Sequence, residues 1–367
     1  MKIKKIIIFF PIFNKGGLEQ VACTILDYLK RFDLKIYFIT FNKNKYLQFK
    51  NKKAKIICPK IGKINKKKIS NFRKIFFCIK PFVELLKKNN SKNCVILSLQ
   101  NSAVSIILSK IYNFKIIVKN AAPITAFFYL DNFFKSILIF ISKIITYNFA
   151  DGIIVNSQSN KDSLSKFIVR RKKIRMIYNP IILNKKNTKT KRNNQILSVG
   201  RVAYEKGIHI LIDAISKIKN LEFKLIVLGE GSYLKVIKQK VLNLGLKKKI
   251  IFKNWVKKPD KYYKTSKLFV LPSLYEGFGN SLVEAMSFGV PCISTSDSGG
   301  PKEILGNGKY GYLVKKNNVN ELKNKIVFCI KNHNKTRKKS IIAKKSLSRF
   351  DHNICGKKYI NFLNEIL

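Results

Sequence analysis

The chain has 367 residues, and its 74 Lys and Arg against 19 Asp and Glu give a formal net charge of +55. The composition is 46% hydrophobic and 12% aromatic, which excludes a disordered basic tail because such tails lack the apolar residues of a core. The charge suggests a nucleic-acid partner. Only nine of the basic residues are Arg, however, the side chain that contacts phosphate and guanine through two hydrogen bonds. We therefore expect no nucleic acid, and interpret most Lys as solvated surface.

The cysteines indicate the compartment. Their number, seven, is odd, and no Cys-x-x-Cys occurs, so the spacing predicts neither a disulfide framework nor a zinc site. A reducing, cytoplasmic location is expected. No stretch reaches 18 uninterrupted apolar residues, and we predict no transmembrane helix.

Apolar runs alternate with amphipathic segments along the first half of the chain. The predicted strands are 3–10, 35–41, 54–58, 94–99, 115–118, 152–155 and 174–177, and the predicted helices are 18–30, 74–88, 103–111 and 159–167. Continuous apolar strands separated by helices are typical of a parallel sheet that is covered on both faces. This half is predicted to be one α/β domain.

The alternation stops at a polar stretch, 184–194, and then resumes. The second set of strands is 196–199, 224–228, 250–252, 268–271 and 292–294, with helices at 207–218, 233–244 and 281–288. We predict an α/β fold of two doubly wound Rossmann-like domains that face a central crevice. The predicted limits are 1–178 for the N-terminal domain, 179–194 for a linker, 195–345 for the C-terminal domain and 346–367 for a closing helix.

Two of the scarce acids, Glu276 and Glu284, enclose a loop with Gly277 and Gly279 that follows an apolar strand. At such a junction of strand, loop and helix, free backbone N–H groups point at an anion. Glu284 then lies where it can accept hydrogen bonds from ribose hydroxyls. An alternative stays open, since Ser281 and Glu284 also have the spacing of a capping box. A capping box leaves Glu276 and the two glycines unexplained.

A second strand end carries two cations. The predicted strand 196–199 ends at Gly200, and Arg201 and Lys206 follow before the next helix. Ligands of doubly wound folds bind at the carboxyl ends of strands, where two cations can neutralise a diphosphate. The alternative for Arg201 is an ordinary ion pair with Glu205.

A glycine pair, Gly16 and Gly17, precedes the first predicted helix. It is compatible with a phosphate loop but has neither the Gly-x-Gly-x-x-Gly nor the Walker pattern. No two acidic residues are separated by one residue, so no Asp-x-Asp metal clamp is present, and we predict no metal.

These segments resemble a glycosyltransferase of the GT-B fold, of the large retaining family 4 type (glycosyl transferases group 1). The residues that carry the resemblance are Gly16-Gly-Leu-Glu19, Asp151-Gly-Ile-Ile-Val-Asn-Ser-Gln-Ser159, Ile177-Tyr-Asn-Pro180, Val199-Gly-Arg-Val-Ala-Tyr-Glu-Lys-Gly207, Glu276-Gly-Phe-Gly-Asn-Ser-Leu-Val-Glu284 and Ser298-Gly-Gly-Pro-Lys-Glu303. The resemblance covers nearly the whole chain.

The resemblance implies a donor site. Arg201, Lys206 and Glu276 would be the catalytic group, with the two cations on the donor diphosphate and Glu276 beside the sugar. The implied donor-binding residues are Gly16, Gly17, Gly200, Gly277, Phe278, Gly279, Asn280, Ser281, Leu282, Val283 and Glu284. Many family members carry a His near the donor sugar in the N-terminal domain, but no His precedes His209 here. Asn120 is the expected substitute as a sugar contact.

The implied reaction is transfer with retention of configuration, without metal and without a cofactor other than the nucleotide-sugar substrate. Cations and the amides of residues 281–283 would stabilise the charge that develops on the leaving phosphate. The motif Ser298-Gly-Gly-Pro-Lys-Glu303 inclines us toward a UDP-linked donor. The acceptor is expected to be a glycan or a lipid-linked glycan in the synthesis of bacterial cell-surface polysaccharide or lipopolysaccharide.

One stretch, 126–143, is strongly aromatic and apolar and is bracketed by Lys. It predicts either a helix at an anionic membrane surface, on the inner face of the plasma membrane, or ordinary packing under the sheet. Two other functions stay open: a nucleotide-sugar epimerase of GT-B fold, and a basic nucleic-acid-binding protein.

Overall fold

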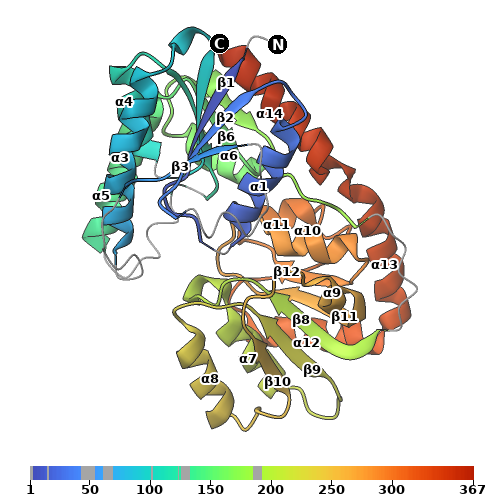
Figure 1. Cartoon of the computed structure of the whole chain (residues 1–367). Helices are drawn as coiled ribbons and strands as arrows, with labels where there is room; N and C mark the ends of the chain where they lie inside the picture. The colour runs from blue at the N-terminus through green and yellow to red at the C-terminus, as the bar shows by residue number, and fades with distance from the viewer. Residues whose placement is uncertain are drawn as a thin grey trace. The chain divides into compact units, whose positions relative to one another are not determined.

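The structure is a computed structural model (Figure 1). It describes residues 3–14, 16–42, 54–60, 69–100, 102–122, 124, 133–184 and 192–367. The chain divides into two compact units. Unit 1 comprises Met1–Pro180 and His352–Leu367, and unit 2 comprises Ile181–Asp351.

Unit 1 contains a seven-stranded parallel sheet of order β3-β2-β1-β4-β5-β6-β7. Its strands are β1 (Lys5–Phe9), β2 (Lys35–Ile39), β3 (Lys55–Ile57), β4 (Cys94–Ser98), β5 (Lys115–Asn120), β6 (Gly152–Val155) and β7 (Ile174–Met176). All seven had been predicted from their apolar runs, with small differences at the ends. Central strands such as β4 are buried along their whole length, which is why they are apolar without alternation.

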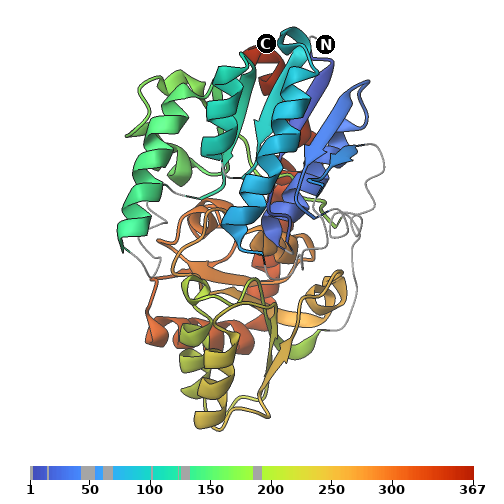
Figure 2. The same ribbon diagram turned by 60° about the vertical axis from the view of Figure 1, so that its left-hand side comes forward.

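Helices cover both faces of this sheet (Figure 2). They are α1 (Gly17–Leu29), α3 (Asn71–Lys87), α4 (Ser102–Ile111), α5 (Phe133–Phe149), α6 (Gln158–Ser165) and α14 (His352–Ile366). One core cluster joins the sheet to α1 and α14, and a second joins it to α3, α4, α5 and α6.

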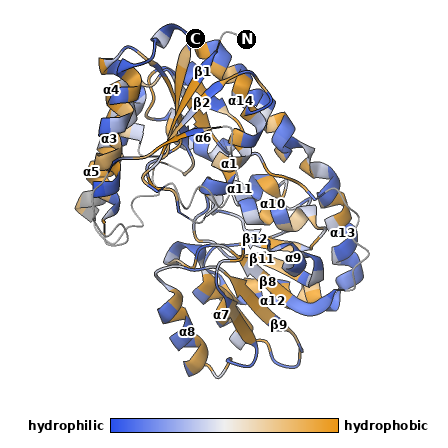
Figure 3. Ribbon diagram, viewed as in Figure 1, coloured by the Kyte–Doolittle hydropathy of each residue, from blue (hydrophilic) through white to orange (hydrophobic). Residues whose placement is uncertain are grey.

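Unit 2 contains a six-stranded parallel sheet of order β10-β9-β8-β11-β12-β13. Its strands are β8 (Asn193–Val199), β9 (Lys224–Leu228), β10 (Ile250–Lys253), β11 (Ser266–Leu271), β12 (Cys292–Thr295) and β13 (Tyr312–Val314). Its helices are α7 (Ile208–Ser216), α8 (Leu234–Asn243), α9 (Asp260–Thr265), α10 (Asn280–Ser287), α11 (Gly300–Ile304), α12 (Val319–Lys331) and α13 (His333–Lys345). The strands at the centre of both sheets are strongly hydrophobic (Figure 3). The fold is therefore the predicted pair of Rossmann-like α/β units.

Several elements of unit 2 had not been predicted. Strand β13 has only three residues, and α9 and α11 are single turns or little more. Helix α12 was also missed, although the sequence indicates where it begins. The Asn318 side chain accepts a hydrogen bond from the Glu321 backbone N–H at 2.9 Å. That bond is an N-cap, and the Asn-x-x-Glu spacing is visible in the sequence.

The limits of the units differ from the predicted ones at two places. Strand β8 begins at Asn193, inside the stretch 179–194 that had been assigned to a linker; residues 185–191 of that stretch lie outside the described residues. The tail 346–367 is divided, since a 3-10 turn, Ser346–Phe350, belongs to unit 2 and only α14 belongs to unit 1. Helix α14 joins unit 1 because Tyr359, Phe362 and Leu363 are buried in its core.

Within the described residues no helix is both long and apolar enough to span a membrane. None of the seven cysteines, all of which lie in the described residues, forms a disulfide, and six of them are buried.

Candidate active site

The two motif-bearing loops of unit 2 follow neighbouring strands. Strands β8 and β11 pair in parallel, with Ile196 opposite Leu268 and Leu197 opposite Phe269. Because parallel strands end at the same edge of a sheet, the loop after β8 and the loop after β11 must meet there. The sheet order thus brings together segments about 70 residues apart in the chain.

The central contact of this edge is an ion pair between Lys206 and Glu276. The Lys206 Nζ donates to Glu276 Oε2 at 2.7 Å, and the two side chains are only 20% and 15% exposed. The Ser273 hydroxyl donates to the same oxygen at 3.2 Å. Two of the three predicted catalytic residues are therefore in contact. The Oε2 atom of Glu276 accepts two hydrogen bonds, which hold the carboxylate in place.

The two loops also join through their backbones. The Leu274 N–H donates to the Glu205 carbonyl at 2.9 Å. Gly207, between the turn Tyr204–Lys206 and α7, has φ +65, and a Cβ there would lie 2.0 Å from the Pro272 carbonyl oxygen. Only glycine satisfies both the left-handed conformation and the close approach.

Glu276 is anchored on its other side by the Ser298-Gly-Gly motif. Its N–H donates to the Ser298 carbonyl at 2.6 Å, and the Gly300 N–H donates to its carbonyl at 3.3 Å. Gly299 has φ +111, and a Cβ there would lie 2.3 Å from the Glu276 carbonyl oxygen. In the sequence, this motif was noted only because it resembles a motif of the family. In the structure, the backbone of Ser298 and Gly300 fixes the backbone of Glu276.

Helix α10 begins at Asn280 after Gly279, which has φ +108, and no side chain caps it. The capping-box alternative for Ser281 and Glu284 is therefore wrong. Instead, Glu284 Oε2 accepts a hydrogen bond from the Tyr263 hydroxyl at 2.8 Å. Burial raises the pKa of Glu284, and the Tyr263 bond opposes that rise.

Tyr263 is a site residue that the sequence did not reveal. Its side chain is 1% exposed and its ring stacks on Phe288, with centroids 5.4 Å apart. It lies in α9, which has six residues and no motif. Nothing in the sequence connects it to Glu284, because the contact arises only when α9 and α10 are placed on the same sheet.

The first-turn amides of α10 are partly used within the helix. The N–H groups of Leu282 and Val283 both donate to the Gly279 carbonyl, at 3.0 and 3.3 Å, and both side chains are fully buried. Gly277 and Phe278 lie in the loop before the helix, where Gly300 packs against the Phe278 backbone so closely that a Cβ would be 2.6 Å away. Of the three amides predicted to face a phosphate, those of Leu282 and Val283 are thus engaged within the helix, and a phosphate contact of the Ser281 amide stays a prediction.

Arg201 and Gly200 follow β8 directly. The Gly200 N–H donates to the Leu228 carbonyl, which extends the sheet by one residue. Arg201 is 69% exposed in its side chain and pairs with Glu205 at 2.6 Å. The ion pair that we had weighed as an alternative is thus present, and the exposed guanidinium lies at the same strand end as Lys206.

The remaining predicted residues belong to unit 1. Gly16 immediately precedes α1, and a Cβ there would lie 2.8 Å from Glu19 Oε2, while Gly17 is the first residue of the helix. The Glu19 carboxylate accepts the Asn14 N–H at 2.9 Å. The glycine pair therefore lies at the start of α1, after the segment that follows β1, and its contact with a phosphate stays a prediction.

Asn120 ends β5 and is 1% exposed, yet neither its amide nitrogen nor its amide oxygen has a hydrogen-bond partner among the residues that the structure describes. A buried amide without partners costs roughly 1–3 kcal/mol. Such a group at the carboxyl end of a central strand indicates a place for a polar ligand.

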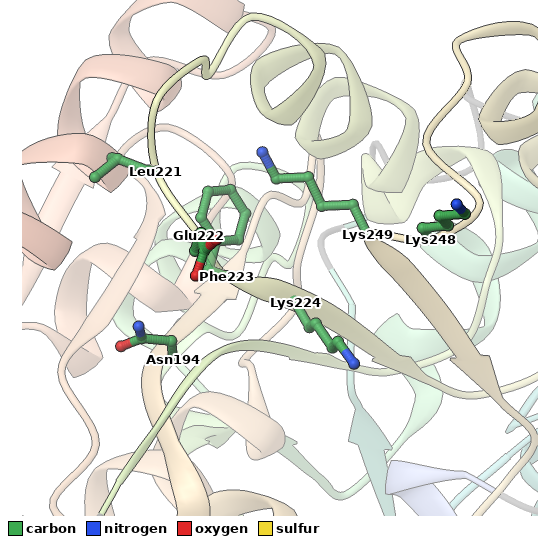
Figure 4. A pocket seen from close by; sticks show the side chains of 7 residues that line it. All are labelled: Asn194, Leu221, Glu222, Phe223, Lys224, Lys248 and Lys249. Atoms are coloured by element: carbon green, nitrogen blue, oxygen red, sulfur yellow. The ribbon is translucent and has the colours of Figure 1, made fainter.

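A surface cavity of unit 2 lies elsewhere (Figure 4). It is lined by Asn194, Leu221, Glu222, Phe223, Lys224, Lys248 and Lys249. These residues lie at the amino ends of β8, β9 and β10, the edge opposite to the motif loops. The cavity includes none of the predicted site residues. In the part of the chain that the structure describes, no group of three metal-ligating side chains occurs.

Two family models match the chain. The model for Glycosyltransferase Family 4 matches residues 15–185, and the model for Glycosyl transferases group 1 matches residues 181–346. A solved structure of HepE from Anabaena, in complex with UDP and glucose, superimposes with a TM-score of 0.83 at 20% identity, over 99% of this chain and 100% of that one. Fold and sequence define the molecule as a glycosyltransferase of the GT-B fold.

Similar proteins support the same family. An uncharacterised glycosyltransferase of Methanocaldococcus jannaschii is 30% identical over 347 residues, 82% of this chain and 83% of that one. The N-acetylgalactosamine-N,N'-diacetylbacillosaminyl-diphospho-undecaprenol 4-alpha-N-acetylgalactosaminyltransferase of Campylobacter jejuni is 25% identical over 326 residues, 87% and 88% of the two chains. The chain belongs to the glycosyltransferases of the family 4 type.

Proposed function

We propose that this glycosyltransferase moves a sugar from a UDP-linked donor to a glycan or lipid-linked glycan acceptor, with retention of configuration, in the synthesis of bacterial surface polysaccharide. The observation that carries the proposal is the Lys206–Glu276 pair at the joined ends of β8 and β11. It combines a cation for a diphosphate with a carboxylate for sugar hydroxyls. HepE binds UDP and glucose, and the Campylobacter relative acts on a diphospho-undecaprenol acceptor.

In this proposal the protein acts mainly by stabilising charge. Departure of the nucleoside diphosphate builds negative charge on the β-phosphate, and Lys206 and Arg201 lie where two cations can meet it. The amide of Ser281 at the start of α10 adds a donor aligned with the helix dipole. No step in this scheme calls for a metal. We therefore predict that transfer does not require one.

The roles of the two carboxylates differ by environment. Glu276 is fixed by Lys206 and Ser273 through one oxygen, which leaves the other to orient sugar hydroxyls. Glu284 is held through Oε2 by Tyr263, which leaves Oε1 for the ribose. In unit 1 the unpartnered amide of Asn120 is the proposed sugar contact in place of the family's His.

The proposed location is cytoplasmic, at the inner face of the plasma membrane, where a lipid-linked acceptor is exposed. The epimerase alternative has no observation in its favour, since both family models and the named relatives are glycosyltransferases. The same comparisons leave the nucleic-acid alternative without support.

The donor can be identified by a panel of UDP-, GDP- and ADP-sugars scored by thermal shift and by release of nucleotide. UDP-sugars should raise the melting temperature, and Glu284→Ala should remove most of that shift. Arg201→Ala should lower the transfer rate by about two orders of magnitude, as expected for loss of an oxyanion-stabilising donor.

Two variants far from the site serve as controls. Glu222→Ala removes an exposed carboxylate at the opposite sheet edge, and Arg171→Ala removes an exposed guanidinium of unit 1. Both should behave as the unmodified chain. The proposal fails if no nucleotide sugar stabilises the protein, or if Glu284→Ala and Arg201→Ala keep full binding and transfer.

A further inference from the structure

Helix α5 has an apolar stripe on its outer side. Five side chains at spacings of four, three, four and four residues are 47–79% exposed: Phe134, Leu138, Ile141, Ile145 and Phe149. This spacing follows one face of a helix. The opposite side of α5 is already packed, with Tyr147 in the core and Phe140 against Phe167 at 5.3 Å. Residues 126–132 of the stretch 126–143 lie outside the described residues. For the part of the stretch within α5, packing under the sheet accounts for the inner side only.

The stripe continues onto the two neighbouring helices. Phe72 and Phe76 on α3 are 79% and 65% exposed, and Ile107 and Ile111 on α4 are 54% and 65% exposed. The three helices cover the same face of the unit 1 sheet, and α3, α4 and α5 lie side by side in Figure 2. We call these nine side chains the α3–α5 face. Half of the eighteen large apolar side chains that are exposed in the described part of the chain belong to it.

Such a face is unusual for a surface in contact with water alone. Single exposed apolar side chains are normal, but a contiguous set marks an interaction site. The orange segments of α3 and α5 in Figure 3 show the apolar residues interspersed with hydrophilic ones. The arrangement is that of an amphipathic surface rather than of a core turned outward.

The charge of the same helices indicates the partner. Their sequences contain seven basic residues and one acid, Glu84. Arg73, Lys80 and Lys87 are exposed beside the apolar side chains of α3. Lys110 is exposed as well but pairs with Asp151 at 2.9 Å, and burial lowers the pKa of Lys143 to about 7. A second copy of the chain would present the same positive charge, so self-association through this face is opposed by repulsion. An anionic surface that also accepts apolar side chains fits both properties.

We propose that the α3–α5 face binds the surface of a lipid bilayer that contains anionic phospholipid. The phenyl and branched aliphatic side chains enter the boundary between headgroups and acyl chains, and the Lys and Arg side chains contact the lipid phosphates. Binding to the bilayer would bring the enzyme to a lipid-linked acceptor. It does not depend on glycosyl transfer and is measured without it.

Flotation of the whole chain tests the proposal. Vesicles of phosphatidylcholine alone are compared with vesicles that contain one third phosphatidylglycerol, at 20 mM and 500 mM NaCl, conditions that differ strongly in screening. The chain should float with the anionic vesicles at low salt and much less at high salt. The variant Leu138→Ser/Ile141→Ser/Ile145→Ser should lose about tenfold or more in partition coefficient even at low salt.

The charge contribution is measured with Lys80→Glu/Lys87→Glu, which should abolish the preference for anionic vesicles. Two matched controls lie on α8 of unit 2. Val236→Ser/Leu242→Ser removes apolar side chains that are 51% and 50% exposed, and Lys235→Glu/Lys238→Glu makes the same change of charge. Both controls should float like the unmodified chain.

The outcomes separate this proposal from the proposed function and from other partners. An unchanged melting temperature of the α5 variant would show that its fold persists, whether or not the chain transfers a sugar. The proposal is overturned if the unmodified chain does not float at low salt, or if the α5 variant floats equally well. It is also overturned if the α5 variant only converts a dimer to a monomer in light scattering, because the partner is then a second copy.

Discussion

At the scale of single residues, the site depends on how each carboxylate is held. Glu284 bonds to Tyr263 through one oxygen, and Tyr263 is itself fixed by its stacking on Phe288. A hydrogen bond to a charged group contributes roughly 1.5–3 kcal/mol. If Glu284 binds the donor as proposed, Tyr263 is a positioning residue that acts on the donor through Glu284.

Removing this hydroxyl should weaken donor binding selectively. We expect Tyr263→Phe to raise the KM for the nucleotide sugar about tenfold and to leave kcat within about twofold, since the ring still packs. The lost bond should raise the pKa of Glu284 further, because burial already raises it and Tyr263 opposes that rise. The acid limb of the profile of kcat/KM against pH should then move to higher pH.

The adjacent Tyr262 offers a control, and Tyr262→Phe should leave KM and the acid limb unchanged. A purely structural role of Tyr263 would lower the melting temperature without moving the acid limb. That result would contradict the assignment of a positioning role.

At the scale of elements, the join between the loops after β8 and β11 depends on Gly207. A Cβ at this position meets the Pro272 carbonyl at 2.0 Å in addition to the strain of φ +65. Gly245 has nearly the same backbone, φ +66, but no atom lies within 4 Å of its Cβ position. A comparison of substitutions at Gly207 and Gly245 therefore separates the cost of backbone strain from the cost of disturbing the contact between the loops.

Gly245→Ala should lower the free energy of unfolding by about 1 kcal/mol, the cost of the left-handed conformation. Gly207→Ala should lower it by at least about 2 kcal/mol more, and should also lower the transfer rate, because the loop must move and Lys206 with it. Urea denaturation and steady-state kinetics measure both. Equal losses of stability in the two variants would refute the role of the contact.

A second element-scale contact joins β5 to α14. Lys119 is 3% exposed, its Nζ donates to the Tyr359 hydroxyl at 2.5 Å, and burial lowers its pKa to about 7. Between pH 7 and about 10 the unfolded chain holds a proton at this residue that the folded chain has lost. Stability must therefore rise with pH across this window, and below pH 7 the contribution no longer changes.

The expected slope from Lys119 is about 1.4 kcal/mol per pH unit between pH 7.5 and 9.5. Lys119→Met should remove that part of the slope, measured by urea denaturation at each pH. Lys55→Met, an exposed substitution on β3, should retain it. If the slopes of the unmodified chain and Lys119→Met coincide, Lys119 is charged in the folded protein and the expected linkage is absent.

At the scale of the whole molecule, the charge of +55 opposes compaction. Like charges repel more strongly in the folded state, where they are closer together, and salt screens the repulsion. The melting temperature should therefore rise between 10 mM and 100 mM NaCl, over which the Debye length falls from about 30 to about 10 Å. An equal rise in KCl distinguishes screening from binding of a particular cation. A melting temperature that stays constant or falls would show that the Lys side chains are already compensated.

Most of the fold was predictable because buried parallel strands need continuous apolar runs. Strands such as β6 and β9 were predicted to the residue, since both faces of each are covered. Short elements escaped prediction, because β13 and α11 bury too few residues to create a pattern. The boundary between the units was also misplaced at the tail, where periodicity shows a helix but not the core that it joins.

The sequence by itself determined the class of molecule and predicted the candidate site residues, because the scarce acids and the glycines at strand ends lie in local motifs. Only the tertiary structure decided which of them touch. The pairing of β8 with β11 brings Lys206 to Glu276, and the placement of α9 beside α10 brings Tyr263 to Glu284. The outward side of α5 likewise became evident only when its inner side was seen to be packed. A pattern along the chain records local preference, whereas contacts between distant segments follow from the order of strands in a sheet.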